Sequence, residues 1–325
     1  MNSGLPQIAI VQMVVKPGKP DINVNQMVNH INEARNEGAE VIVFSELCVT
    51  GYILGDIWEI DSYVEDYSLY SEDIRRVSKD ITIVFGNVAI DKENCGQDGR
   101  CRKYNAVYVC NNGEYVIREE VPDGLPHGIH PKTLHPNYRF FDDDRHFFSL
   151  RQLADSYGRP LSDWLYPYKI KRRNGTNFKF AVQLCEDMWF HDYLSNNNSI
   201  NILKTFASHG AQAAFNLSAS PWTWKKDVKR NKVIQNTIKS CPIPFFYVNQ
   251  VGAQNNGKNV IVFDGESAIY NRQGELVQQA SPWEPSILYQ NKNFLPPKKS
   301  EKSEIASIFS ALCIGLKHLD EIRNI

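Results

Sequence analysis

The stretch Val41-Ile42-Val43-Phe44-Ser45-Glu46-Leu47 sets the fold class, because four consecutive apolar residues lead almost directly to a carboxylate. An unbroken apolar run of this length is typical of a short strand that is buried on both faces. A second β-rich run precedes it at Gln7 to Val15. Between the two runs, apolar residues recur at helical spacing, with Asn23 as the expected N-cap and Gly38 as the C-terminal stop. The N-terminal region therefore predicts strand, helix and strand in that order.

The alternation of strands and helices continues to about residue 290. Further strands are predicted at 81–90, 105–110, 115–117, 178–184, 212–217, 245–248, 260–263 and 267–270, and helices at 202–208 and 225–238. Asn112-Gly113 and Gln273-Gly274 are typical tight-turn sequences. The pattern predicts one layered α/β domain over residues 1–290. Residues 291–325 are expected to form an exposed linker and a final helix with apolar residues at helical spacing.

The composition narrows the classes of partner. Lys and Arg total 36 against 37 Asp and Glu, so the charge balance gives no reason to expect nucleic acid or an anionic membrane. Seven cysteines without a CxxC pair predict reduced thiols and no Cys/His zinc site. No secretion signal and no apolar run of about 18 residues is visible. A cytoplasmic protein is therefore expected.

Two predicted strand ends carry side chains suited to catalysis. Glu46 follows the predicted strand at 41–44, and Cys185 directly follows the strand at 178–184. A partly buried carboxylate can serve as a base, and a thiol beside such a base can serve as a nucleophile. Each residue also has a plainer interpretation. Glu46 could cap the next turn, and Cys185 could be a small buried hydrophobe.

Lys132 is the third candidate, in a segment rich in Pro, Gly and His that is expected to be a long loop. A lysine in a cleft can stabilise an oxyanion, although a solvated surface lysine is the commoner case. His127, His130 and His135 lie in the same region. Their irregular spacing favours surface histidines over metal ligands, so no metal site is expected.

Taken in order along the chain, these motifs resemble the Glu-Lys-Cys signature of the nitrilase (carbon-nitrogen hydrolase) superfamily. The motifs are Phe44-Ser45-Glu46-Leu47, Lys132 with Pro136-Asn137-Tyr138, and Cys185-Glu186-Asp187-Met188-Trp189. Within that superfamily the sequence is most similar to the glutaminase domains of glutamine-dependent NAD synthetases. Two positions depart from the family pattern. His135 stands where Leu usually precedes Pro-Asn-Tyr, and Asp143 stands where a Glu is common.

The resemblance implies a four-layer α-β-β-α sandwich that forms homo-oligomers. It also implies hydrolysis of the L-glutamine side-chain amide, with Glu46 as base, Cys185 as nucleophile and Lys132 at the oxyanion. Ammonia would pass to an NAD synthetase domain or partner that amidates deamido-NAD with ATP and Mg²⁺. This domain itself would need no cofactor. The final helix would lead toward such a synthetase domain, whose phosphate-loop motif does not occur in the sequence.

The residues expected to contact substrate are less closely defined. By resemblance, Tyr138, Phe141 and Glu186 line the pocket, and Ser220, Lys226 and Arg230 are candidates for holding the substrate carboxylate. A free-standing amidase acting on another small linear amide or carbamoyl amine would use the same three catalytic residues. A catalytically silent scaffold for a synthetase is a second alternative. A protease pairing Cys185 with His191 is disfavoured, because six residues is a poor fit to a pair that spans a cleft.

Overall fold

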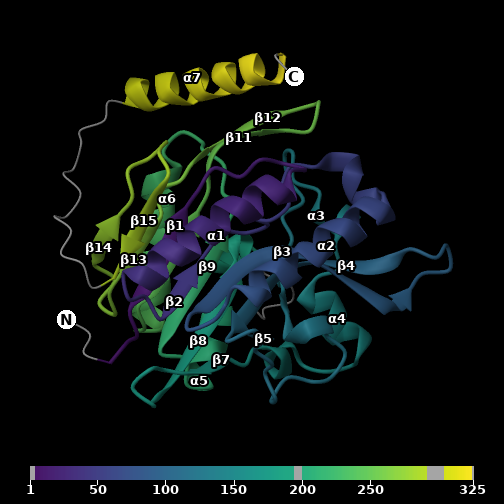
Figure 1. Cartoon of the computed structure of the whole chain (residues 1–325), viewed down its shortest axis with the longest axis vertical. Helices are drawn as coiled ribbons and strands as arrows, with labels where there is room; N and C mark the ends of the chain where they lie inside the picture. The colour runs from purple at the N-terminus through teal and green to yellow at the C-terminus, as the bar shows by residue number, and fades with distance from the viewer. Residues whose placement is uncertain (1–3, 194–199, 291–303, 324–325) are drawn as a thin grey trace.

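The computed structural model describes residues 4–193, 200–290 and 304–323 (Figure 1). The first of its two large sheets contains β1 (Ile8–Gln12), β2 (Val41–Val43), β3 (Thr82–Cys95), β4 (Cys101–Asn111), β5 (Glu114–Tyr115), β6 (His130–Pro131) and β15 (Ser286–Tyr289). Their order is β15-β1-β2-β3-β4-β5, and β6 pairs with β4. β1, β2 and β3 run parallel, as strands joined by crossover helices do. β15 closes one edge antiparallel to β1.

The second sheet is built from the later part of the chain. It contains β7 (Tyr168–Lys171), β8 (Asn177–Leu184), β9 (Ala213–Ser218), β10 (Phe245–Asn249), β13 (Ala268–Tyr270) and β14 (Leu276–Gln279). Their order is β14-β13-β10-β9-β8-β7, with β8, β9 and β10 parallel. A separate antiparallel pair is formed by β11 (Val251–Asn255) and β12 (Val260–Asp264).

Four helices cover the outer faces of the two sheets. On the first sheet, α1 (Pro20–Asn36) and α2 (Asp61–Arg76) supply the buried side chains Met27, Ile31 and Ile74. On the second sheet, α5 (Ile202–Ser208) and α6 (Lys226–Ser240) supply Leu203, Phe206 and Ile234. The apolar positions on these helices recur every three or four residues, which is why one face of each is buried.

The inner faces of the two sheets form a third apolar core. It joins Ile10, Val43 and Val84 of the first sheet to Phe180, Phe215 and Phe246 of the second. The layers therefore run helix, sheet, sheet, helix, and the predicted four-layer α-β-β-α sandwich is confirmed. Short elements fill the connections: α3 (Asp143–His146), α4 (Leu150–Ser156), η1 (Gly55–Glu59), η2 (Pro126–Gly128), η3 (Leu161–Trp164) and η4 (Cys185–Asp192).

The predicted start of the first helix is wrong. Asn23 is not its N-cap, because α1 begins three residues earlier, at Pro20. Proline is favoured in the first turn since its fixed φ suits a helix and its missing N–H would be unpaired there. The buried Asn23 side chain instead accepts a hydrogen bond from the Lys16 N–H (2.9 Å) and donates to the Val49 carbonyl (2.9 Å). It therefore ties the helix to the loop that carries Glu46.

The predicted final helix is confirmed as α7 (Glu304–Arg323), which lies along the β11–β12 pair (Figure 1). Two contacts join its first turn to the segment before α6. Trp222 Nε1 donates to Ser307 Oγ at 2.9 Å, and Lys225 Nζ lies 2.9 Å from Glu304 Oε1. The predicted linker, at the start of residues 291–325, lies outside the described residues. The division into residues 1–290 and 291–325 therefore stays a prediction. No helix in the described part of the chain is long and apolar enough to cross a membrane.

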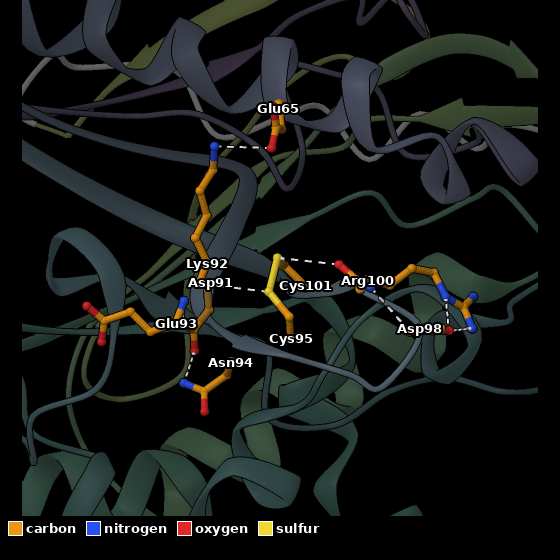
Figure 2. The surroundings of a disulfide bond; sticks show 10 residues. Glu65, Asp91, Lys92, Glu93, Asn94, Cys95, Asp98, Arg100 and Cys101 are labelled. Carbon is orange, nitrogen blue, oxygen red and sulfur yellow. Dashed lines mark hydrogen bonds and ion pairs between the residues drawn. A yellow bond between two sulfur atoms is a disulfide. The ribbon is translucent and has the colours of Figure 1, made fainter.

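The prediction that every cysteine is reduced is wrong for one pair. Cys95 and Cys101 form a disulfide near the tip of the β3–β4 hairpin, close to the Lys92–Glu65 ion pair (Figure 2). The two residues are Cα partners in that hairpin, a proximity that a separation of six residues does not reveal. Four other cysteines are buried thiols, and Cys313 is an exposed thiol.

Candidate active site

Glu46 lies three residues beyond β2 and is completely buried. Its Oε1 accepts hydrogen bonds from Lys132 Nζ and Asn105 Nδ2, both at 2.8 Å, and its Oε2 accepts from the Ala219 N–H at 2.9 Å. Gly86 of β3 permits this placement, because a Cβ there would lie 2.4 Å from the Leu47 nitrogen. The carboxylate is therefore held rigidly between the two sheets, and the interpretation of Glu46 as a turn cap is not supported.

Lys132 directly follows β6 and is 1% exposed, so it is not the solvated surface lysine that was the commoner alternative. Besides Glu46, its ammonium contacts Asp143 Oδ2 at 2.8 Å. Tyr52 donates a hydrogen bond to the other oxygen of Asp143. Burial alone would lower the pKa of Lys132, but Asp143 and Glu46 outweigh it and hold that pKa well above its usual value. Lys132 is therefore a fixed cation.

Cys185 is the first residue after β8 and opens η4. Its φ of +35° is rare for a residue with a side chain and is found where local structure enforces it, often at functional sites. Burial raises the pKa of Cys185 to about 12; the nearby Glu46 charge also raises it, while Lys132 and Lys226 lower it. The resting side chain is therefore a neutral thiol that needs a base before it can attack.

These three residues line one cavity of about 650 Å³. Residues that the sequence predicted as substrate contacts are also in its lining, namely Tyr138, Phe141, Glu186 and Lys226. Lys229 joins them from the next turn of α6. The structure thus brings together side chains from positions 46 to 229, although they lie in four separate segments of the sequence.

Glu186 gives the cavity a fixed acidic group. Tyr193 donates to its Oε1 at 2.8 Å, and the Tyr138 hydroxyl lies 3.2 Å from its Oε2. Burial raises the pKa of Glu186, while these two hydroxyls and the charges of Lys132 and Lys226 oppose that effect. Burial lowers the pKa of Lys226, with the nearby Arg230 charge acting in the same direction. The cavity therefore holds acidic and basic groups close to the thiol.

Two of the proposed substrate contacts lie elsewhere. Arg230 is 2% exposed and is outside the cavity lining, because its guanidinium is taken up by Tyr247, Asp264, Glu266 and the Gly265 carbonyl. Ser220 is also buried behind the lining, where its N–H donates to Asn249 Oδ1 at 2.9 Å. The structure therefore places Arg230 and Ser220 behind the cavity wall, and a contact of either residue with the substrate stays a prediction.

The histidine prediction was also partly wrong. His127 is exposed, but His130 is fully buried against Arg118 (3.1 Å), and His135 is buried against Asp144 (2.8 Å). The segment looks like a surface loop in sequence because it is rich in Pro and Gly, yet β6 draws it into the first sheet. Among the described residues, no group of three or more His, Cys, Asp or Glu is placed to hold a metal ion.

Three residues that support the site are not among those predicted from the sequence. Asn105 sits on β4 and bonds Glu46, and Tyr193 bonds Glu186 from the end of η4. Asp187 accepts hydrogen bonds from the N–H groups of Thr133 (3.0 Å), Leu134 (2.8 Å) and Leu184 (3.0 Å). It therefore links the segment after Lys132 to the strand before Cys185. Of the three, only Asp187 lies in a sequence motif that pointed to the site, namely the motif that begins at Cys185.

Comparison with known proteins identifies the family. The sequence profile of the carbon-nitrogen hydrolases matches residues 7–292. This chain belongs to the carbon-nitrogen hydrolase family. It is therefore an amidohydrolase by family, with the Glu46, Lys132 and Cys185 motifs inside the matched region.

Its curated relatives include glutamine-dependent NAD(+) synthetases. The enzyme of Acinetobacter baylyi is 28% identical over 283 residues, and that of Synechocystis is 27% identical over 276 residues. These matches cover 87% and 83% of this carbon-nitrogen hydrolase but only 43% of each relative. The chain thus spans less than half the length of the synthetases it resembles.

Solved structures share the fold. A glutamine-dependent NAD+ synthetase from Acinetobacter baumannii in complex with ADP aligns with a TM-score of 0.69 at 24% identity, covering 95% of this chain and 51% of that one. An amidase of the nitrilase superfamily from Nesterenkonia aligns with a TM-score of 0.64 at 16% identity, covering 89% of this chain and 92% of that one. At these identities the likeness establishes the common architecture.

Proposed function

We propose that this chain hydrolyses the side-chain amide of L-glutamine through a thioester on Cys185. The observation that carries the proposal is the composition of the cavity that holds Glu46, Lys132 and Cys185. The same cavity contains a carboxylate fixed by two tyrosines, Glu186, and two lysines, Lys226 and Lys229. Such a lining suits an amide substrate that carries both an ammonium and a carboxylate group, as a free amino acid does.

In the proposed first half-reaction, Glu46 takes the thiol proton while Cys185 Sγ attacks the amide carbon. Lys132 and the backbone N–H of Glu186 hold the oxyanion, and one such donor is typically worth about 3 kcal/mol of the barrier. When the tetrahedral intermediate collapses, the C–N bond breaks and Glu46 passes its proton to the departing ammonia. A thioester between Cys185 and the glutamyl group remains.

In the second half-reaction, Glu46 removes a proton from water, which attacks the thioester carbonyl. The C–S bond breaks, glutamate leaves, and the proton returns to Cys185. One carboxylate serves both halves because it is a base again after ammonia has left. These steps use only side chains and backbone groups of this chain, and we propose that the domain needs no cofactor.

The names of the relatives indicate which kind of reaction would consume the ammonia. They are glutamine-dependent NAD(+) synthetases, and this chain matches only 43% of their length. We therefore propose that ammonia is consumed by an NAD synthetase domain or partner that amidates deamido-NAD and itself binds ATP and Mg²⁺. Homo-oligomerisation and a cytoplasmic location belong to the same proposal.

A second candidate is a free-standing amidase for another small linear amide or carbamoyl amine. The fold shared with the Nesterenkonia amidase supports it, because that protein is an amidase. The two candidates share Glu46, Lys132 and Cys185 and differ in what Glu186 and the two lysines must recognise. Substrate competition therefore separates them.

The test is covalent labelling with a glutamine-shaped diazoketone, followed by intact mass measurement and peptide mapping. We expect one stoichiometric adduct on Cys185 that excess L-glutamine prevents. Cys185→Ala should give no adduct at this position. Cys313→Ala is the matched control, because Cys313 is an exposed thiol that the proposal does not use.

Three outcomes contradict the proposal in different ways. If the folded protein formed no adduct on Cys185, Cys185 would not be the nucleophile. An adduct that L-glutamine fails to prevent, but that another small amide does prevent, would favour the amidase. If Glu186→Gln changed neither the labelling of Cys185 nor its protection by L-glutamine, Glu186 would not be the group that recognises the substrate ammonium.

A further inference from the structure

Two neighbouring carboxylates at the start of α3 each bind a side chain from the segment that carries Lys132. Asp143 Oδ2 lies 2.8 Å from Lys132 Nζ, and Asp144 Oδ1 lies 2.8 Å from His135 Nδ1. Asn137 strengthens the second contact, since its Nδ2 donates to Asp144 and its Oδ1 accepts from the Asp144 N–H at 3.2 Å. The two pairs therefore lie side by side between the same two backbone segments.

The position of α3 matters because Asp143 is a short carboxylate. An aspartate reaches one methylene less than a glutamate, so Asp143 contacts Lys132 only if the α3 backbone lies close to residues 132–137. α3 has four residues, too few to hold its place through its own helical hydrogen bonds. The backbone contact from the Asp143 N–H to the Pro136 carbonyl is long, at 3.4 Å. Elsewhere α3 is held by Arg145, which lies 2.8 Å from Asp56, and by His146, which lies 2.6 Å from Glu59. Its side-chain contacts to residues 132–137 are made by Asp143 and Asp144.

His135 makes its contact with Asp144 from a buried position. Its side chain is 2% exposed, while the Asp144 side chain is 52% exposed, so the pair is anchored on the histidine side. Tyr193 further holds the segment by donating to the His135 carbonyl at 3.2 Å. The hydrogen bond from His135 is the largest cause that lowers the pKa of Asp144, which is consistent with a charge-assisted contact.

We propose that His135 is a positioning residue, whose contact with Asp144 fastens α3 so that Asp143 holds Lys132 against Glu46 beside Cys185. The proposal rests on the proposed function. It also joins two departures from the family pattern, His135 and Asp143, into one arrangement in which the histidine compensates for the shorter carboxylate. His135 also lines the cavity, so a direct contact with substrate is the alternative that the test must separate.

The test compares His135→Leu and His135→Asn with the wild type in diazoketone labelling of Cys185 at several reagent concentrations. We expect His135→Leu to lower the maximal labelling rate about tenfold, since small displacements of catalytic groups have effects of this size or larger. The half-saturating concentration should stay within about twofold of the wild-type value, because substrate recognition lies elsewhere. His135→Asn, which keeps a donor near the Nδ1 position, should recover most of the rate.

The compensation is tested in an Asp143→Glu background. There the longer carboxylate reaches Lys132 without close approach of α3, so His135→Leu should cost less than about threefold, a non-additive result that marks coupled residues. His30→Leu is the matched control. His30 forms a pair with Glu33 at 4.0 Å on α1, far along the chain from the cavity residues.

Hydrogen–deuterium exchange supplies a readout that needs no substrate. His135→Leu should speed amide exchange in a peptide covering residues 142–147, and His30→Leu should not. If His135→Leu left this exchange unchanged, His135 would not fasten α3. This result would count even if the wild type failed to react with the diazoketone and the proposed function were wrong. A raised half-saturating concentration with an unchanged maximal rate would also overturn it. So would an equal loss of rate from His135→Leu with and without the Asp143→Glu substitution.

Discussion

Cys185 is a weak acid in this protein, and its reactivity therefore depends on which reagent meets it. Burial and the Glu46 charge raise its pKa to about 12, so the thiolate fraction near neutral pH is very small. The thiolate is the form that attacks simple alkylating agents. We expect the rate of Cys185 alkylation by iodoacetamide to rise about tenfold per pH unit from pH 7 to pH 10 without reaching a plateau, as a thiol with so high a pKa requires. Peptide mapping gives this rate separately from that of Cys313.

The direction of the pH effect follows from the direction of the pKa shift. A raised pKa keeps the thiol protonated, so raising the pH increases reactivity until the pH approaches 12. Labelling by the diazoketone should depend less steeply on pH, because Glu46 takes the proton within the complex. A plateau in iodoacetamide alkylation below pH 8 would show that Cys185 rests as a thiolate, and Glu46 would then not be required as its base.

Single residues were predictable where the chemistry and the sequence motif coincided. Glu46, Lys132 and Cys185 are predicted by the order of their motifs, which resembles the nitrilase signature, and the structure places all three in one cavity. Arg230 could not be assigned from sequence, because its partners Asp264 and Glu266 lie more than 30 residues away and take up its guanidinium. His135 was misjudged for the same reason, since its burial depends on how β6 joins the first sheet.

At the scale of elements, Asp187 connects the two segments that carry Lys132 and Cys185. Its two oxygens accept three backbone N–H groups, from Thr133, Leu134 and Leu184. Asp187→Asn would turn an amide NH₂ toward one of these donors and leave a buried N–H unpaired. We expect a loss of about 1–3 kcal/mol in the free energy of unfolding, measured by urea denaturation. Diazoketone labelling of Cys185 should slow as well.

Asp155→Asn serves as the control, because Asp155 is an exposed aspartate on α4. Its free energy of unfolding should stay within about 0.5 kcal/mol of the wild-type value, as is usual for surface positions. If Asp187→Asn proved as stable as Asp155→Asn, the three hydrogen bonds would not be what holds the two catalytic segments together.

Elements were predictable from sequence where apolar periodicity was strong. The strand at 178–184 and the helix at 202–208 correspond closely to β8 and α5. α2 was missed because its buried positions include Tyr67 and Ser71, which weaken the apolar stripe of a largely polar helix. β15 was also missed. It is a short strand that pairs with β1, at the other end of the chain, and local sequence carries no sign of that pairing.

At the scale of the whole molecule, the site exists only because the two sheets meet. Glu46 and Lys132 follow strands of the first sheet, while Cys185 and the Ala219 N–H follow strands of the second. The apolar core between the sheets therefore determines the distance from base to nucleophile. α7 is outside this arrangement, since of its described residues only Ala311 is buried.

The surface of α7 leads to a prediction about the domain boundary. Its large apolar side chains are 41–76% exposed, namely Ile305, Ile308, Phe309, Leu312, Leu316, Leu319 and Ile322. A chain ending at residue 290 should lose little stability, with a melting temperature within about 4 °C of the intact value, which corresponds to roughly 1–2 kcal/mol for a protein of this size. Removing so large an exposed apolar surface should also reduce self-association in light scattering.

Labelling of Cys185 decides how that truncation is interpreted. The shortened chain should keep the adduct and its protection by L-glutamine, because neither sheet nor the cavity lining includes a residue beyond 290 among those the structure describes. Loss of labelling with an unchanged melting temperature would mean that α7 acts on the site, and the route would be its contacts with Trp222 and Lys225 beside the cavity. Ser307→Ala and Glu304→Gln in the intact chain would then reproduce the loss. A large fall in melting temperature would instead show that α7 is part of the folded domain, and the predicted boundary at residue 290 would be wrong.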